Sequence, residues 1–179
     1  MVVKLAAVGL VLCSLCGCAT VYDNKDILNQ SFPRVTGESL EEEVVRLPDH
    51  FSGQHTILLL GYEQNAQFDI DRWLLGLTDS QLQATVYEIP TVVGMFPGMI
   101  SGRIDDGMRS GIPAELWISV ITVYGGDAER LARFTGNEKP LNARVILLDP
   151  GGRVVYFHDR GYGIPYLKAL IALIPAPGE

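Results

Sequence analysis

The chain has no cysteine beyond residue 18. Its three cysteines, Cys13, Cys16 and Cys18, all lie in the stretch LCSLCGC at residues 12–18. Thiol–disulfide exchange and thiol-dependent peroxide reduction both need a thiolate as the nucleophile. A domain folded from the rest of the chain therefore lacks the group on which these two reactions depend.

Basic residues are also few. The chain has 14 Lys and Arg against 21 Asp and Glu, a formal net charge of -7, and no basic patch interleaved with aromatic residues. An acidic domain repels phosphate backbones, so nucleic acid is not an expected partner. The sequence also has no internal repeat, phosphate loop, nucleophile elbow or metal motif, and His50, His55 and His158 are scattered. We therefore expect neither a metal nor another cofactor.

The first residues have the plan of a targeting segment. Lys4 supplies one positive charge, and residues 5–15 form an apolar run broken only by small residues. This arrangement is typical of a secretory signal peptide. A membrane-spanning helix needs about 20 apolar residues, and the uncharged stretch 5–22 falls slightly short while carrying Gly, Ser and Thr. We therefore predict a signal peptide over residues 1–17.

The sequence LCGC at residues 15–18 resembles a bacterial lipobox. The resemblance implies a lipid on Cys18, which would attach the protein to a membrane without a spanning helix. Ala19 resembles a sorting signal for the outer membrane, so we expect the protein at the periplasmic face of that membrane. Two alternatives stay open: a metal site of three cysteines, with no His, Asp or Glu nearby, and an uncleaved anchor helix. The uncleaved anchor would also leave the chain exported and tethered.

The sequence after residue 17 divides into three parts. Residues 18–30 are short and polar and predict a tether, residues 31–174 predict one domain, and residues 175–179 predict a flexible tail.

In the domain, the glutamates at 41–43 indicate a solvated face, Pro97 should kink a helix, and Asp127 is a candidate N-cap. Apolar runs and helical periodicity predict an edge strand at 31–37, strands at 55–62, 83–89, 116–124, 143–149 and 153–158, and helices at about 68–77, 91–109, 127–134 and 164–174.

The last quarter of the domain carries a resemblance to a known fold. The sequence VILLDPGGRVVYFHDRGY, at residues 145–162, resembles the end of a thioredoxin-like domain and is distantly similar to peroxiredoxins. The resemblance implies an α/β three-layer sandwich with a mixed central sheet of about five strands and a C-terminal β-hairpin plus helix. YEIP at 87–90 and GMRSGIP at 107–113 resemble the mitochondrial ATP synthase assembly-factor family and its bacterial relatives.

The departures from redox thioredoxins concern their reactive groups. The family's cysteine pair opens the helix after the first central strand, but here that turn reads EQNAQ at residues 63–67. Alignment on Asp149 places Ala143 where the family has its cis-proline, and Pro140 lies too early to replace it. The resemblance therefore implies a thioredoxin-like domain without redox activity.

The turn after the first central strand is one candidate site. Its polar residues stand at the carboxyl end of a central strand, where α/β sheets tend to hold ligands. They could line a ligand cleft or serve only as an ordinary loop cap: Glu63, Gln64 and Asn65.

A second candidate is a docking surface for a protein partner on the helix at 91–109. Asp105 and Arg109 are spaced as an i, i+4 ion pair, which could equally belong to a solvated helix face. Methionines in this segment could add a soft apolar surface. The candidate partner-binding residues are Met95, Met99, Arg103, Asp105, Asp106 and Arg109.

These observations support a leading hypothesis and two alternatives. The leading one is a lipid-anchored, redox-inactive thioredoxin-like domain that binds another envelope protein, as an assembly or maintenance factor. The first alternative is a diverged peroxidase-like or other enzyme with a non-thiol site near residues 63–65. The second is a carrier that holds a small ligand in the same cleft.

Overall fold

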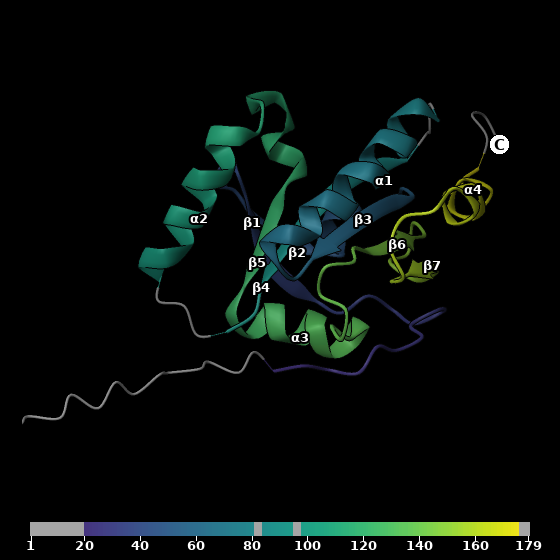
Figure 1. Ribbon diagram of the computed structural model, residues 1–179, viewed down its shortest axis with the longest axis horizontal. Coiled ribbons are helices and arrows are strands. Elements are labelled where there is room, and N and C mark those ends of the chain that lie inside the picture. The colour runs from purple at the N-terminus through teal and green to yellow at the C-terminus, as the bar shows by residue number, and fades with distance from the viewer. Residues whose placement is uncertain (1–19, 81–83, 95–97, 176–179) are drawn as a thin grey trace, which may run out of the picture.

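A mixed sheet of seven strands forms the centre of the protein (Figure 1). The computed structural model describes residues 20–80, 84–94 and 98–175. Their order is β1 (Val35–Ser39), β2 (Val44–Leu47), η1 (Asp49–Phe51), β3 (Thr56–Gly61), η2 (Gln64–Ala66), α1 (Gln67–Asp79), β4 (Thr85–Val92), α2 (Gly98–Gly111), η3 (Ala114–Ser119), β5 (Ile121–Tyr124), α3 (Gly125–Thr135), β6 (Arg144–Leu148), β7 (Val154–His158) and α4 (Ile164–Ile171), where η marks a 3-10 helix.

The strands lie in the order β2-β1-β5-β4-β3-β6-β7. Strands β3, β4 and β5 are parallel, and the other neighbours pair antiparallel. The predicted α/β class is confirmed, with seven strands in place of about five. Every residue of β3 and β6 is buried, as expected for central strands covered on both faces.

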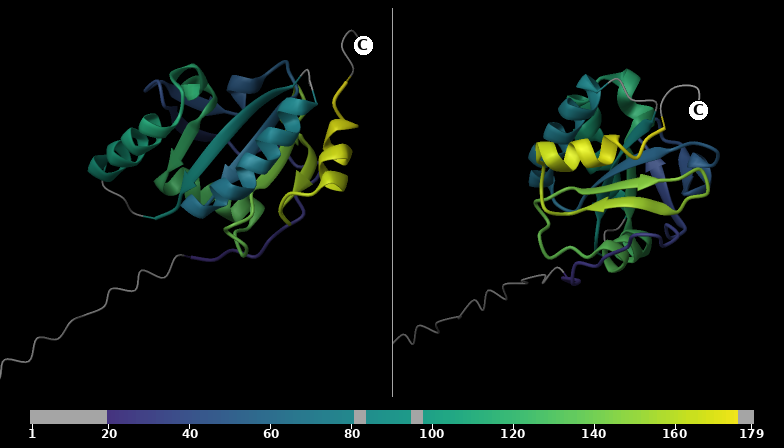
Figure 2. Two further views of the ribbon diagram at one scale, coloured as in Figure 1. Left: turned by 45° about the horizontal axis from the view of Figure 1, so that its top comes forward. Right: turned by 90° about the vertical axis from the view of Figure 1, so that its right-hand side faces the viewer.

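Helices cover both faces of the sheet (Figures 1 and 2). Right-handed crossovers from β3 to β4 and from β4 to β5 place α1 and α2 on one face, and α4 packs against α1 on that face. Helix α3 covers the other face, where Leu131 joins Leu58 and Leu60 in the core. Trp73 of α1 is fully buried and anchors the core on the first face.

The β1–β2 hairpin accounts for the two additional strands. The sequence predicted an edge strand at 31–37 followed by a solvated face, but β1 lies inside the sheet, between β2 and β5. Alternate residues of the hairpin, among them Val35, Val45 and Leu47, point into the core. The three glutamates at 41–43 belong to the turn between the strands, so their charge concealed a hairpin with a buried side.

Three predicted elements between residues 83 and 135 need correction. Strand β4 continues past Pro90, which pairs with Gly61, and α2 begins only at Gly98. Residues 114–119 form η3 rather than a strand, because Pro113 immediately precedes this turn and fits the entry of a helix better than a strand. Tyr124, not Asp127, occupies the N-cap of α3. The expected kink at residue 97 lies outside the described residues.

The C-terminal part agrees with the predicted hairpin and closing helix. Strands β6 and β7 pair antiparallel, and the Asp149 carboxylate accepts the backbone N–H groups of Gly151 and Arg153, both at 2.9 Å. Gly152 has φ +78°, a left-handed conformation that suits glycine in this turn. Among the described residues, no helix is long and apolar enough to cross a membrane.

Residues 20–30, which we call the N-terminal strap, lie along the domain. The strap runs beneath α3 and reaches the edge of β7 (Figures 1 and 2). The Lys25 N–H donates to the carbonyl of Thr135, and the Asn29 N–H donates to the carbonyl of Val154 at 2.8 Å. Ile27 is 1% exposed and belongs to the core under α3. The described part of the predicted tether is therefore bound to the fold rather than free.

Candidate functional site

An open cleft of about 560 Å³ lies where β3 ends and α1 begins. One wall comes from η2 and α1, a second from the loop before β6, and a third from the loop after β7. Three segments distant in the sequence thus meet at the carboxyl end of a central strand, where α/β sheets commonly bind ligands. The lining residues are Asn65, Phe68, Asp69, Arg72, Leu141, Asn142, Arg160, Gly161 and Tyr162.

The predicted cleft residues contribute to this site unequally. Asn65 lines the cleft, whereas Glu63 and Gln64 are exposed in the turn beside it. Glu63 occupies the N-cap position of η2 without a side-chain capping hydrogen bond. The turn stands in the place expected from the sequence, but most of the lining comes from residues that sequence reasoning did not identify.

Asp69 joins the three walls of the cleft. Its buried carboxylate accepts the Ala143 N–H at 2.9 Å and the Tyr162 N–H at 2.7 Å. Ala143 stands where the redox family has its proline, and a proline there would have no N–H to donate. The sequence showed only an acidic residue in the first turn of α1, because both partners are 74 or more residues away.

Arg144 holds the loop at 136–142, which supplies one wall of the cleft. Its side chain is fully buried and donates to the carbonyls of Gly136 at 3.1 Å, Lys139 at 2.6 Å and Asn142 at 2.7 Å. It also donates to the Asn24 side chain of the strap at 3.1 Å. Burial lowers the pKa of Arg144, but an arginine remains a cation at neutral pH. This residue therefore couples the cleft wall to the N-terminal strap.

Free cations and exposed apolar groups stand together at the cleft. Arg72 and Arg160 form no ion pair with any other described residue. Phe68 is 70% exposed and Leu141 is 51% exposed, so both present apolar surface at the cleft. The cleft can therefore bind carboxylates through its arginines and an apolar group through Phe68 and Leu141.

The charged residues on α2 face different ways. Asp105 is buried and accepts the hydroxyls of Thr122 at 3.1 Å and Tyr124 at 2.8 Å, both on β5. Arg109 forms ion pairs with Asp106 at 3.0 Å and Glu42 at 3.4 Å. The predicted i, i+4 pair between Asp105 and Arg109 is therefore wrong, because Asp105 points at the sheet.

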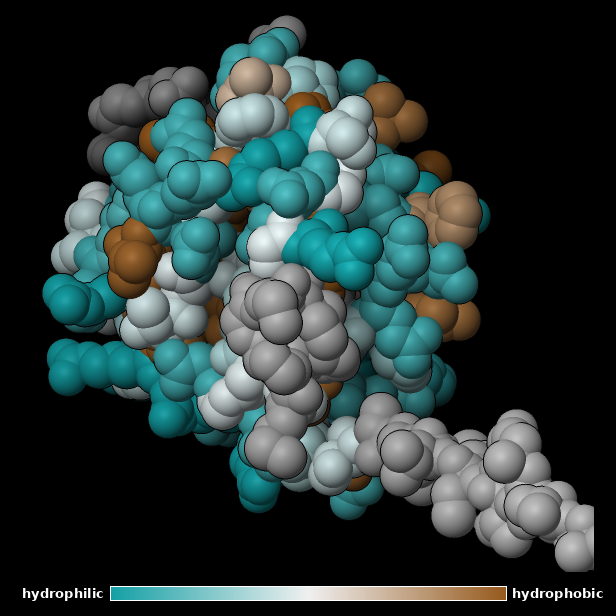
Figure 3. Space-filling model, turned by 90° about the vertical axis from the view of Figure 1, so that its left-hand side faces the viewer, coloured by the Kyte–Doolittle hydropathy of each residue, from teal (hydrophilic) through white to brown (hydrophobic). Residues whose placement is uncertain are grey.

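The remaining α2 candidates differ in exposure and in their contacts. The Arg109 Nε group also donates to the carbonyl of Leu40 at 2.7 Å, which ties α2 to the β1–β2 hairpin. Arg103 and Asp106 are exposed. Figure 3 views the side of the molecule that carries α2, and its coloured surface is largely hydrophilic with apolar side chains scattered singly. Met95 and the side chain of Met99 lie outside the described residues.

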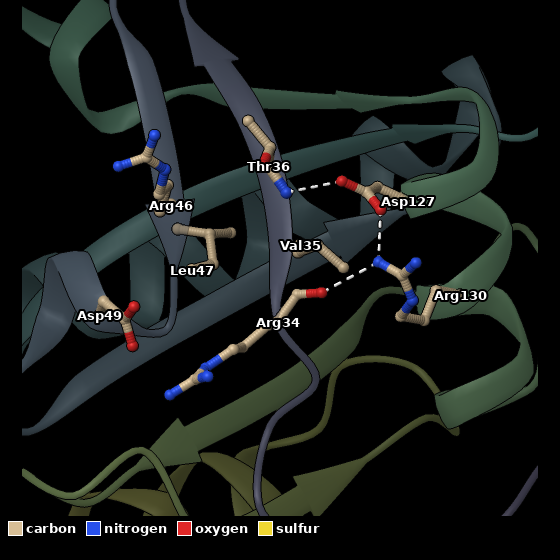
Figure 4. A pocket seen from close by; sticks show the side chains of 8 residues that line it. All are labelled: Arg34, Val35, Thr36, Arg46, Leu47, Asp49, Asp127 and Arg130. Carbon is tan, nitrogen blue, oxygen red and sulfur yellow. Dashed lines mark hydrogen bonds and ion pairs between the residues drawn. The ribbon is translucent and has the colours of Figure 1, made fainter.

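A second, smaller pocket of about 170 Å³ lies between the β1–β2 hairpin and α3 (Figure 4). Arg130 pairs with Asp127, which also accepts the Thr36 N–H at 2.8 Å. In Figure 4 the side chains of Arg34 and Arg46 extend away from each other, on either side of Leu47. This pocket was not predicted from the sequence, and its charges do not converge on one point. Among the described residues, no group of three or more His, Cys, Asp or Glu side chains could hold a metal.

Comparison with known proteins gives matches in structure alone. The sequence matches no protein-family model and no curated protein. The thioredoxin domain of a thiol-disulfide oxidoreductase from Bacteroides vulgatus superposes with a TM-score of 0.52 at 15% identity, over 84% of this chain and 100% of that one. The exposed lipoprotein thioredoxin Etrx1 of Streptococcus pneumoniae gives 0.52 at 10% identity, over 78% and 98%. BsSco, of the Sco family of cytochrome c oxidase assembly proteins, gives 0.55 at 11% identity, over 82% and 93%.

These likenesses establish the fold. The chain has a thioredoxin-like fold, and the likeness covers most of this chain and nearly all of each of the three neighbours. The fold predicted from the β6–β7 hairpin is thus confirmed. At this level of identity the likeness says nothing of activity.

Proposed function

We propose that this chain is a lipid-anchored, redox-inactive thioredoxin-like domain that binds a segment of another cell-envelope protein. The observation that carries the proposal is the cleft between α1 and the loops at 136–142 and 159–162. It occupies the carboxyl edge of the sheet, yet its walls present arginines, an amide and exposed apolar side chains instead of a thiol. The anchor on Cys18 is supported by the resemblance of residues 15–18 to a lipobox.

The chemistry of the cleft favours a polypeptide ligand of a particular kind. Arg72 and Arg160 present planar cations that bind carboxylates in a bidentate way. Phe68 and Leu141 add apolar surface beside these charges. A peptide segment that combines a carboxylate with an apolar side chain would use both features at once. The best fit is therefore a short acidic and apolar segment of the partner.

A role in assembly or maintenance agrees with the relatives of the fold. BsSco belongs to a family named for the assembly of cytochrome c oxidase. The short sequences at 87–90 and 107–113 resemble ATP synthase assembly factors. We therefore propose that the partner is a component of an envelope complex that the domain holds during assembly or maintenance.

Substitutions in the cleft provide the test. Full-length wild type, Arg72→Glu and Arg160→Glu would be crosslinked in native membranes, and captured proteins would be quantified by mass spectrometry. Both variants should lose the wild-type partner by roughly tenfold or more, because each reverses a charge that faces the ligand. Arg103→Glu is the matched control, since Arg103 is exposed on α2 outside the cleft.

The control also separates the two candidate surfaces. If only Arg103→Glu loses the partner, the docking surface lies on α2 and not at the cleft. If all variants capture the partner equally, neither surface binds it. Peroxide and disulfide turnover would be assayed on protein purified from membranes. Any turnover above the uncatalysed rate would overturn the proposal that the domain is redox-inactive.

A further inference from the structure

The start of the N-terminal strap is hydrogen-bonded to the loop at 136–142. The Asn137 side chain donates to the carbonyl of Thr20 at 3.2 Å and accepts the Tyr22 N–H at 2.6 Å. The Asn137 N–H donates to the carbonyl of Tyr22 at 2.9 Å. At Gly136 a Cβ would overlap the backbone of Asn24, so glycine allows this close approach. The strap is therefore bound from its first described residue.

The Tyr22 side chain fastens the same point to α3. Its hydroxyl donates to Glu129 at 2.6 Å, and the guanidinium of Arg133 lies 5.0 Å from the centre of its ring. Arg133 also pairs with Glu129 at 2.7 Å. Thr20 and Tyr22 are thus bound through backbone and side-chain contacts to α3 and to the loop that follows it.

This attachment limits how the domain can sit on a membrane. Only Ala19 separates Cys18 from Thr20, and two residues span at most about 7 Å. A domain of this size has a radius of gyration of about 15 Å. We infer that the domain lies directly on the bilayer, with the loop at 136–142 and the mouth of the cleft turned toward the lipid surface. This inference rests on the membrane anchor of the proposed function.

The side chains at this end suit a lipid surface. Val21 is 64% exposed, and Leu141 and Phe68 are also exposed. Lys139, Arg72 and Arg160 stand near these apolar residues, on the same loop and at the same cleft. Apolar side chains among Lys and Arg are typical of surfaces that lie in the interfacial region of a bilayer.

The views of the fold agree with this orientation. The left panel of Figure 2 places the start of the described chain beside the loop at 136–142 and near the end of α1 that follows η2. In the same panel η3 lies at the opposite end of the molecule. A partner segment would then enter the cleft from the plane of the membrane, so the partner segment would be a juxtamembrane part of an integral protein.

Two leucines with equal exposure allow a direct test. Leu141 of the cleft and Leu116 of η3 are each 51% exposed. Leu141→Cys and Leu116→Cys would be made in the full chain, purified from membranes, labelled with a fluorophore and placed in phosphatidylethanolamine–phosphatidylglycerol vesicles containing spin-labelled lipid. The label at 141 should be quenched several-fold more than the label at 116. Equal quenching, or stronger quenching at 116, would overturn the orientation.

Two controls separate this inference from the proposed function. Intact mass should show an acylated chain that begins at Cys18, and wild type should take up no thiol label; a chain without lipid would overturn both proposals. A second control inserts ten Gly and Ser residues between Ala19 and Thr20, which should abolish the difference in quenching between the labels at 141 and 116. If the lengthened chain keeps that difference, the short tether is not its cause. Arg72-dependent capture of the partner together with equal quenching would overturn the orientation alone.

Discussion

At the scale of single residues, two buried charged groups organise the end of the molecule that carries the cleft. Asp69 accepts two backbone N–H groups from loops 74 and 93 residues away. Arg144 donates to three carbonyls of its neighbouring loop and to Asn24, 120 residues away. Hydrogen bonds to charged groups are stronger than neutral ones and fix geometry. These residues therefore hold together segments that are distant in the sequence.

Removal of the Asp69 carboxylate should destabilise the domain. Asp69→Ala leaves the N–H groups of Ala143 and Tyr162 without their acceptor, so we expect a loss of about 3 kcal/mol in the free energy of unfolding. Asp71→Ala is the matched control on the same helix, because Asp71 is exposed and accepts a hydrogen bond from the exposed Gln67 side chain. It should cost less than about 0.5 kcal/mol. Urea unfolding measures both, and equal losses would contradict the role given to Asp69.

At the scale of elements, the N-terminal strap protects an edge of the sheet. The Asn29 N–H donates to the carbonyl of Val154, and the Val154 N–H donates to the carbonyl of Gln30. Arg153 adds a bond from its side chain to the carbonyl of Asn29 at 2.6 Å. Strand β7 ends the sheet on this side, and an unpaired edge invites association with other chains. The strap therefore contributes to the fold itself.

Neighbouring residues of the strap allow a matched test of its packing. Ile27 is 1% exposed and Leu28 is 46% exposed. Ile27→Ala removes buried methyl groups from the core under α3, so we expect a loss of about 3 kcal/mol in stability. Leu28→Ala should change stability by less than about 0.5 kcal/mol. Thermal and urea unfolding measure the difference, and a strap that is not docked would give two similar, small effects.

The elements best predicted from the sequence have strong local patterns. The continuous apolar run of β3 predicts a buried strand, and the proline and glycines between β6 and β7 predict the turn of a hairpin. The β1–β2 hairpin was predicted only in part: the edge strand expected at 31–37 overlaps β1, but β2 and its pairing were missed because the glutamates of the turn indicated a solvated face. The place of the cleft beside Asn65 was predicted, but Arg72 and Arg160 were not, since α1 and the loop after β7 are distant in the sequence and meet only in the folded chain.

At the scale of the whole molecule, the features on which the proposed function rests gather at one end. The chain is acidic overall, yet two arginines without ion pairs among the described residues stand at the cleft. The loop at 136–142 forms a wall of the cleft and also binds the start of the strap through Asn137. Membrane attachment and partner binding would therefore share one structural unit. A change in this loop should affect both properties, whereas a change in η3 should affect neither.

The stability of the whole domain should decline in alkaline solution. Burial raises the pKa of Tyr62 to about 12 and that of Tyr156 to about 12, and it also raises the pKa of Tyr87 and Tyr124. An unfolded tyrosine ionises near pH 10. These folded pKa values lie above the unfolded value. The contribution of the tyrosines to the free energy of unfolding is therefore complete below pH 10 and is lost as the pH rises toward 12.

Tyr62→Phe should make this alkaline decline shallower. Tyr62 shares a hydrogen bond of 2.7 Å with the Thr135 hydroxyl, so the variant should lose about 1 kcal/mol of stability at pH 7. Between pH 10 and 12, however, the free energy of unfolding of the variant should fall by about 2 to 3 kcal/mol less than that of wild type. The reason is that the variant has no hydroxyl at residue 62 whose ionisation would favour the unfolded chain. Urea unfolding monitored by circular dichroism measures these slopes, and a Tyr62→Phe slope equal to that of wild type would show that Tyr62 ionises equally in the folded and unfolded chain.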